Sequence, residues 1–229
     1  MQRIGIIGGM SWESTTEYCR LLNLGVRERL GGLHSARLLL ATVDFAPIVQ
    51  LQQAGDWDAA GEALAVEARA LEAGGADLVL IAANTMHLVF DQVAAAVSIP
   101  VLHIGDVLAA AVKAAGLTRV GLLATKYTME LDFYRDRLAS HGVEALIPDA
   151  ADRTELQRII FDELCHGLVT DTSRERLLET ARNLLDSGAE GIVLGCTELE
   201  LSIRAEHLAA PLFPTTALHC EAALDRAFT

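Results

Sequence analysis

Short runs of apolar residues alternate along the chain with longer segments rich in Ala and Leu. The runs lie at residues 3–9 (RIGIIGG), 37–45, 77–83, 100–104, 119–125, 143–148, 190–196 and 211–216. Most are bounded by Gly or polar residues, which is typical of buried strands in a parallel sheet. Strands of this kind that alternate with helices form a sheet covered on both faces. The pattern therefore predicts the α/β class.

The segment between the second and third runs shows the spacing of an amphipathic helix. In residues 58–76 the apolar positions Ala60, Leu64, Ala68 and Leu71 lie three or four residues apart, so they share one face. Gly74 and Gly75 follow, which predicts the end of the helix there.

The two halves of the chain repeat the same order of segments. Residues 73–85 (AGGADLVLIAANT) align with residues 186–198 (DSGAEGIVLGCTE), and this alignment pairs Ala83 with Cys196. In the same order, 2–9 aligns with 118–125 and 99–106 with 210–217. Any two α/β units would give one such match, but three in order indicate a duplication. We expect a first lobe at 1–98 plus 209–229, a second lobe at 99–208, and an active site in the cleft between them.

The turns after the strands hold the candidate chemistry, because ligands of open parallel sheets bind beyond the carboxyl ends of the strands. These turns contain Gly8-Gly9-Met10-Ser11, Ala83-Asn84-Thr85, Thr125-Lys126-Tyr127-Thr128 and Cys196-Thr197-Glu198. Small residues with hydroxyl, amide and backbone N–H donors suit a small anion such as a carboxylate. Asn84 and Thr85 are candidates for binding it, although Asn-Thr before a helix is also an ordinary N-cap, and Thr197 repeats this in the second half.

Composition and charge narrow the class of partner. Apolar residues make up 52% of the 229 residues, and 18 Lys and Arg against 31 Asp and Glu give a net charge of −13. This charge disfavours nucleic acid and acidic membrane surfaces. No apolar run approaches the roughly 20 residues of a membrane span, and no signal peptide is evident, so we expect a cytoplasmic protein.

The four cysteines, Cys19, Cys165, Cys196 and Cys220, form no CxxC pair and no zinc-binding spacing. A free cysteine is usually a small buried apolar residue, and we expect Cys19, Cys165 and Cys220 to be structural thiols. No nucleotide-binding motif, Schiff-base lysine context or metal-ligand cluster is evident, so we expect neither cofactor nor metal.

Several segments together resemble the aspartate/glutamate racemase family, the cofactor-independent amino-acid racemases. They are GGMSWEST (8–15), LGGLHSA (30–36), VDF (43–45), NTMH (84–87), KYTMELDFYR (126–135), RIIFDELC (158–165) and GCTE (195–198). The closest likeness is to the bacterial branch specific for L-aspartate and glutamate. The resemblance implies two pseudo-symmetric flavodoxin-like lobes, a homodimer, a dicarboxylic amino-acid substrate, and two cysteines on opposite faces of the substrate α-carbon.

Inversion of a stereocentre needs a base on one face of the carbon and an acid on the other. Cys196 matches the family's second cysteine. A thiol and a thiolate serve as acid and base, because a cysteine near a helix N-terminus and N–H donors can be held ionised at neutral pH. Glu198 occupies the place of a histidine in glutamate racemases, so it either tunes Cys196 or is an ordinary acidic residue of a first helical turn.

The chain departs from the family pattern at Ala83, which cannot transfer a proton. The close branch has threonine there. Three alternatives stay open: a native one-cysteine racemase with biased direction, an introduced substitution, or a different reaction such as the decarboxylation catalysed by related one-cysteine enzymes. A dicarboxylate-binding protein without catalysis is a fourth, and retention of GCTE argues against it.

The sequence indicates less clearly which residues bind the distal carboxylate, that of the substrate side chain. By the family register, His166 occupies a position where aspartate racemases commonly carry lysine. Gln52 matches a glutamine of the close branch, and Lys126 is either a ligand of the carboxylate or a solvated surface residue.

Overall fold

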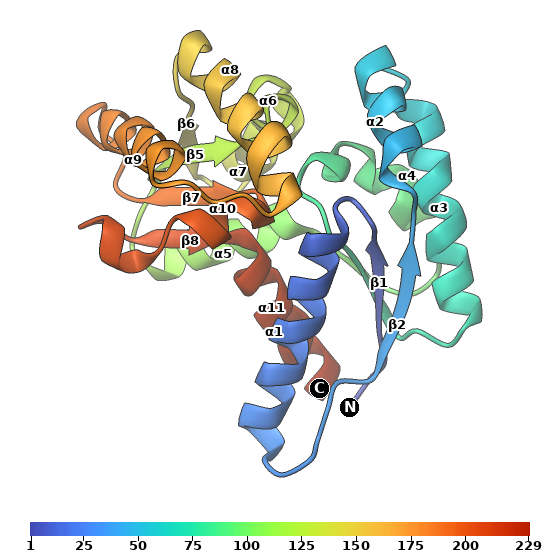
Figure 1. Ribbon diagram of the computed structural model, residues 1–229. Helices are drawn as coiled ribbons and strands as arrows, with labels where there is room; N and C mark the ends of the chain where they lie inside the picture. Colours follow the sequence, from blue (N-terminus) through green and yellow to red (C-terminus); the bar gives the residue numbers. More distant parts are fainter. The chain divides into compact units, whose positions relative to one another are not determined.

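The computed structural model describes residues 1–229 (Figure 1). All the expected strands are present, each within the apolar run that predicted it. They are β1 (Ile4–Gly8), β2 (Leu38–Thr42), β3 (Leu78–Ile81), β4 (Val101–Leu102), β5 (Arg119–Ala124), β6 (Glu144–Leu146), β7 (Ile192–Gly195) and β8 (Leu212–Pro214).

The helices lie between the strands, as an α/β order requires. They are α1 (Trp12–Leu30), α2 (Phe45–Ala54), α3 (Trp57–Ala73), α4 (Phe90–Ala95), α5 (Ile104–Ala114), α6 (Lys126–Glu130), α7 (Asp132–Ser140), α8 (Ala150–Arg158), α9 (Asp171–Asp186), α10 (Thr197–Ser202) and α11 (Thr215–Phe228). Shorter 3-10 helices span Thr85–Val89, Leu164–His166 and Ala205–His207, and a π-helix spans Ile159–Glu163. The predicted helix at 58–76 is α3, which ends before Gly74.

The strands form two four-stranded parallel sheets, with the orders β2-β1-β3-β4 and β6-β5-β7-β8. Their registers reproduce the sequence repeat residue by residue. Ile7 pairs with Ile81 in the first sheet, and the aligned residues Leu123 and Leu194 pair in the second. Val79 pairs with Val101, as Ile192 does with Leu212. The duplication is therefore present in the hydrogen bonding, and the fold confirms two pseudo-symmetric α/β lobes.

In the first unit the alternation of side chains along the strands produces two apolar layers. Ile4 and Ile6 of β1 face a cluster with Tyr18 and Leu22 of α1 and with residues of α11. Ile7 faces the opposite cluster, which α2, α3 and the segment after β3 complete. Figure 1 shows α1 and α11 on one side of this sheet and α2 and α3 on the other.

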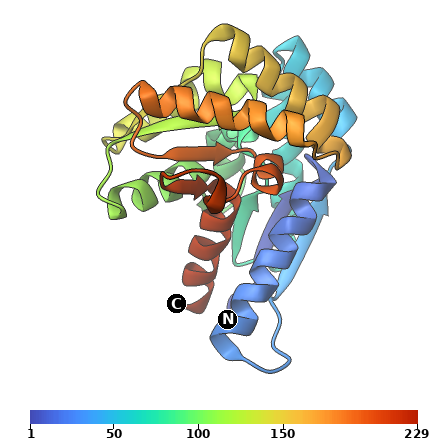
Figure 2. The same ribbon diagram turned by 60° about the vertical axis from the view of Figure 1, so that its left-hand side comes forward.

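The second unit has one continuous apolar cluster that encloses both faces of its sheet. Figure 2 shows α8 and α9 along one side of the strands and α5 on the other. Gly121 of β5 permits the close packing of α9, because a Cβ at this position would lie 2.9 Å from Cβ of Leu184.

The lobe boundaries that we expected from the sequence were wrong by several residues. The first unit comprises Met1–His103 and His219–Thr229, and the second comprises Ile104–Leu218. The reason is strand pairing: β4 is hydrogen-bonded to β3, and β8 is hydrogen-bonded to β7. Each boundary therefore follows a strand that the predicted division had assigned to the other lobe.

None of the helices combines the length and the apolar character that crossing a membrane would require.

Candidate active site

In the first unit, two adjacent strands deliver expected site residues to the same edge of the sheet. The turn after β1 contains Met10 and Ser11, and the turn after β3 contains Ala83, Asn84 and Thr85. Because β1 and β3 are paired in parallel, both turns follow the carboxyl edge of the sheet. Except for half-buried Ala83, these residues are buried.

The turn after β1 depends on Gly9. This residue has φ +92°, and a Cβ there would lie 2.2 Å from the carbonyl oxygen of Val43. Ser11 caps α1, since its Oγ accepts a hydrogen bond from the backbone N–H of Ser14 at 3.3 Å. The Thr15 hydroxyl accepts the N–H of Gly9 and donates to the carbonyl of Ser11. Glycine and hydroxyl groups thus define the path of this turn.

The turn after β3 leads into the 3-10 helix Thr85–Val89. The Asn84 side chain makes no capping hydrogen bond to this helix, so the ordinary N-cap alternative does not describe it. Gln52 of α2 lies beneath the turn: its side chain is 4% exposed, and its Nε2 lies 3.2 Å from Sδ of Met86. Gln52 therefore contacts the segment that carries Asn84 and Thr85.

The second unit repeats this arrangement. Ala124 of β5 pairs with Gly195 of β7, so Thr125 and Cys196 follow paired residues at one edge of the sheet. Thr125 caps α6 by accepting the N–H of Thr128. Cys196 is 8% exposed and directly precedes α10.

Cys196 and Glu198 form a buried thiol–carboxylate pair. Sγ of Cys196 donates a hydrogen bond to Oε2 of Glu198 at 2.9 Å, and Glu198 is 4% exposed. Burial raises the pKa of the Cys196 thiol well above its usual value, and the negative charge and hydrogen bond of Glu198 raise it further. Burial and the neighbouring carboxylate therefore favour the protonated thiol of Cys196 in this state, and they outweigh the start of a short helix, which favours the thiolate.

Thr197 is held from within the second unit. Its Oγ1 accepts a hydrogen bond from the Thr216 hydroxyl at 3.1 Å, and the backbone N–H of Thr216 donates to Oε1 of Glu200 at 2.9 Å. Thr215 donates its hydroxyl to the carbonyl of Leu194 at 2.9 Å. The start of α11 thus supports the turn of Cys196.

The two candidates for the distal carboxylate in this unit lie outside the buried turns. His166 is exposed at the end of the 3-10 helix Leu164–His166, and this helix contacts α10. Lys126 is half exposed, and its Nζ lies 3.9 Å from a carboxylate oxygen of Glu130. This ion pair favours the surface alternative for Lys126.

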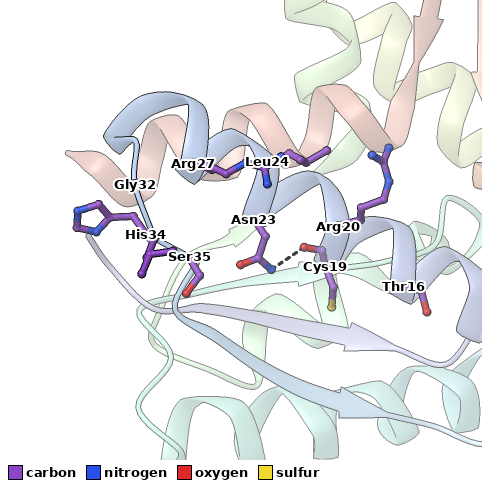
Figure 3. Close-up of a pocket in the computed structure, with 10 residues that line it drawn as sticks. Thr16, Cys19, Arg20, Asn23, Leu24, Arg27, Gly32, His34 and Ser35 are labelled. Atoms are coloured by element: carbon purple, nitrogen blue, oxygen red, sulfur yellow. Dashed lines mark hydrogen bonds between the residues drawn. The ribbon is translucent and has the colours of Figure 1, made fainter.

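Residues that the sequence did not single out also shape the turns. Thr215 and Thr216 lie in an aligned segment and His87 lies in the NTMH segment, but none of the three was a candidate site residue. The signal for Thr215 and Thr216 was their place immediately after a strand, and the signal for His87 was its place in the donor-rich turn after β3. A surface pocket of about 600 Å³ beside α1 and the loop after it, lined by Cys19, Arg20, Asn23 and Arg27 among others, contains none of the expected site residues (Figure 3).

Comparison with known proteins finds a matching family and several similar solved structures. The family model described as Asp/Glu/Hydantoin racemase matches residues 7–223. The structure of a putative Asp/Glu racemase from Yersinia pestis is 46% identical in sequence, covers 100% of both chains and superposes with a TM-score of 0.93. An aspartate racemase homologue from Pyrococcus horikoshii is 35% identical, again over 100% of both chains, with a TM-score of 0.88.

A more distant structure shares the fold. The glutamate racemase of Francisella tularensis, solved with D-glutamate, is 16% identical over 99% of this chain and 81% of its own, with a TM-score of 0.67. The family match extends over nearly the whole chain, through both sheets and both sets of turns. The chain therefore belongs to the Asp/Glu/Hydantoin racemase family.

Proposed function

We propose that this protein exchanges the α-proton of an acidic amino acid, aspartate or glutamate, by cysteine acid/base catalysis without a cofactor. The observation that carries the proposal is the hydrogen bond from the buried Cys196 thiol to the Glu198 carboxylate, at 2.9 Å. A thiol at this position can return a proton to a carbanion, and the carboxylate can hold the thiol proton while the thiolate acts as base.

The proposed step moves protons between Cys196, Glu198 and the substrate α-carbon. Glu198 first accepts the Cys196 proton, and the resulting thiolate removes the substrate α-proton. The thiol that forms then protonates the same face of the carbanion, or solvent protonates it elsewhere. The α-proton exchanges with solvent when the new thiol replaces its proton from solvent before returning it, or when solvent protonates the carbanion directly. Net inversion needs a second proton donor.

Because Ala83 cannot transfer a proton, we expect inversion of the α-carbon to be strongly one-directional or absent. It occupies the position in the first repeat that Cys196 occupies in the second, by sequence and by sheet register. A methyl group neither donates nor accepts a proton. The proposed enzyme therefore has one acid/base pair at Cys196, and bound water is the available partner for the other step.

The donor-rich turns are the proposed substrate-binding elements. Asn84, Thr85 and Thr197 are assigned to the α-carboxylate, and Met10, Ser11 and Thr125 are assigned to substrate binding without a particular group. Gln52 and His166 are assigned to the distal carboxylate, Gln52 through its contact beneath the Asn84 turn. We also carry over from the family resemblance a homodimeric assembly, which light scattering of the purified protein tests.

Deuterium incorporation at the α-carbon of each enantiomer of aspartate and glutamate in D₂O tests the proposal by NMR. We expect exchange in the parent protein and its loss in Cys196→Ser, because a serine hydroxyl is far less acidic than a thiol. Cys19→Ser is the matched control, since Cys19 lies on α1 outside these turns, and should exchange at the parent rate. An exchanging Cys196→Ser variant would exclude Cys196 as the base.

A second candidate is decarboxylation of a small dicarboxylate, which the raised pKa of Cys196 favours. Loss of CO₂ from such a substrate leaves a carbanion that needs only one proton, and a thiol that stays protonated supplies it. The thiolate left behind recovers its proton from water. Release of CO₂ without α-proton exchange of aspartate or glutamate would support this reaction over the first.

A further inference from the structure

Three buried histidines gather at the carboxyl edge of the first sheet. His87, His103 and His219 are 3%, 7% and 0% exposed. The ring centre of His87 lies 4.8 Å from that of His103 and 5.9 Å from that of His219. Phe90 stacks on His87 at 5.9 Å with an angle of 10° between the rings. The cluster has no part in the proton transfer proposed above, so its position calls for another explanation.

The hydrogen bonds of His87 converge on the turn after β3. Its Nδ1 lies 2.8 Å from the carbonyl oxygen of Ala83. A carbonyl only accepts, so Nδ1 carries the proton and donates it. The backbone N–H of His87 also donates to the carbonyl of Asn84 at 3.0 Å. One residue thus binds two consecutive carbonyl groups of the turn.

His219 supports the cluster from the other elements of the unit. Its Nε2 lies 3.2 Å from the carbonyl oxygen of Leu102, so this nitrogen is the donor. Its Nδ1 then accepts the hydroxyl proton of Tyr18, at 2.9 Å. These bonds connect α11 to α1 and to the end of β4. The His87 ring therefore packs against an imidazole that is itself held at both nitrogens.

We propose that His87 is a positioning residue that fixes the Ala83–Thr85 turn in its substrate-binding conformation through the bond from Nδ1 to the Ala83 carbonyl. The inference rests on the proposed function, in which Asn84 and Thr85 bind the substrate carboxylate. Gln52 contacts the same turn through Met86, so the segment is held by side chains from two elements. Loss of the His87 bond leaves a half-buried carbonyl without this donor and frees the turn to move.

Two substitutions separate the donor from the ring. His87→Phe keeps a ring and removes the donor, whereas His87→Asn keeps a donor close to the place of Nδ1 and removes the ring. We expect His87→Phe to raise KM for α-proton exchange about tenfold with kcat changed less than about threefold, and His87→Asn to stay within about threefold of the parent. Val26→Ala is the control: Val26 is buried in the apolar cluster of α1 and α11, so the variant should lower the melting temperature and leave KM unchanged.

A folded His87→Phe variant with the parent KM would overturn the inference, as would a His87→Asn variant as impaired as His87→Phe.

If the parent exchanges no α-proton, the proposed function fails, and amide hydrogen exchange decides the role of His87 separately. The backbone amide of residue 87 should then exchange about tenfold faster in His87→Phe than in the parent and at the parent rate in Val26→Ala. Equal exchange rates in all three proteins would contradict a positioning role.

If His87→Phe does not fold, two other measurements decide the role of His87. They are the KM of His87→Asn and the tautomer of the His87 ring in the parent, which ¹⁵N NMR shows. Loss of binding in His87→Asn, or a proton absent from Nδ1, would refute the assignment.

Discussion

The Glu198 carboxylate acts on the Cys196 thiol in two ways that oppose each other. It favours the protonated thiol through its charge and its hydrogen bond, and it is also the nearest described acceptor for the thiol proton. The first effect lowers the fraction of reactive thiolate in the resting protein. The second effect allows Glu198 to accept the Cys196 proton when a substrate binds.

Substitution Glu198→Gln separates these effects. Removal of the negative charge should lower the pKa of Cys196, so its alkylation by iodoacetamide should begin at a lower pH than in the parent. Exchange of the substrate α-proton should nevertheless fall about 10²-fold or more, because the proton acceptor is lost. Mass spectrometry of the Cys196 peptide across a pH series measures the first quantity, and NMR in D₂O measures the second.

The control for this experiment is Glu206→Gln, which removes an exposed carboxylate in the segment after α10. It should leave both the alkylation profile and the exchange rate unchanged. A Glu198→Gln variant that is alkylated only at higher pH would contradict the assigned role of the carboxylate.

Restoring an acid/base group at Ala83 tests the proposed one-directional reaction. If inversion uses one group from each repeat, as the family resemblance implies, Ala83→Cys should raise inversion of aspartate or glutamate in both directions by about 10²–10⁴-fold. Ala83→Thr should give a smaller gain, because its hydroxyl positions water but is a poor acid. Circular dichroism of each enantiomer over time is the measurement. Unchanged inversion in Ala83→Cys with a reactive Cys196 would favour the one-proton decarboxylation instead.

The sequence identified Cys196 but did not indicate that burial and Glu198 favour the protonated thiol. The motif and the preceding apolar run define where the thiol lies. Its pKa depends on burial by residues from distant parts of the chain and on the rotamer that brings Glu198 to the sulfur, and neither is encoded in local spacing. For the same reason, the support of Thr197 by Thr216 could not be predicted from the segment around either residue.

At the level of elements, the aligned glycines Gly5 and Gly121 place a helix close to a central strand in each sheet. A Cβ at Gly121 would lie 2.8 Å from Cδ1 of Ile192 and 2.9 Å from Cβ of Leu184. Gly121→Ala should therefore lower the free energy of unfolding by about 1–3 kcal/mol, the usual cost of overpacking. Urea denaturation measures it.

Arg182→Ala on the same helix, α9, is the surface control for Gly121→Ala. Its side chain is 49% exposed and pairs only with Glu175, so the expected change is within about 0.5 kcal/mol. A Gly121→Ala protein as stable as the parent would show that α9 shifts without cost.

Strand positions were predictable because buried parallel strands are continuous apolar runs, and every such run contains a strand. Strand pairing was not, since β4 and β8 are only 2 and 3 residues long and their neighbours are chosen by hydrogen bonds across the sheet. The π-helix Ile159–Glu163 also escaped prediction. Local apolar spacing does not distinguish its wider turn from an α-helical one.

For the molecule as a whole, the buried histidine cluster predicts a loss of stability in mild acid. Burial, with the charges of His87 and His103, lowers the pKa of His219 from 6.5 to about 3. The unfolded state therefore binds the proton more tightly than the folded state. Stability falls as the pH drops below 6.5 and continues to fall until about pH 3.

The expected contribution of His219 at pH 5 is a loss of about 2 kcal/mol relative to neutral pH. His219→Gln removes the titrating group and retains an amide donor for the Leu102 carbonyl. Its free energy of unfolding, measured in urea between pH 7 and pH 5, should depend less steeply on pH than that of the parent. Equal slopes would mean that other groups cause the acid sensitivity.

The path of the chain through the two units has a consequence for folding. The strand that completes the first sheet, β4, is followed by α5, whose apolar face belongs to the core of the second unit. The strand that completes the second sheet, β8, is followed by α11, and most of this helix covers Ile4 and Ile6 of the first. Each repeat thus lends its last helix to the other. We therefore expect that neither half of the chain, expressed alone, buries both faces of its own sheet.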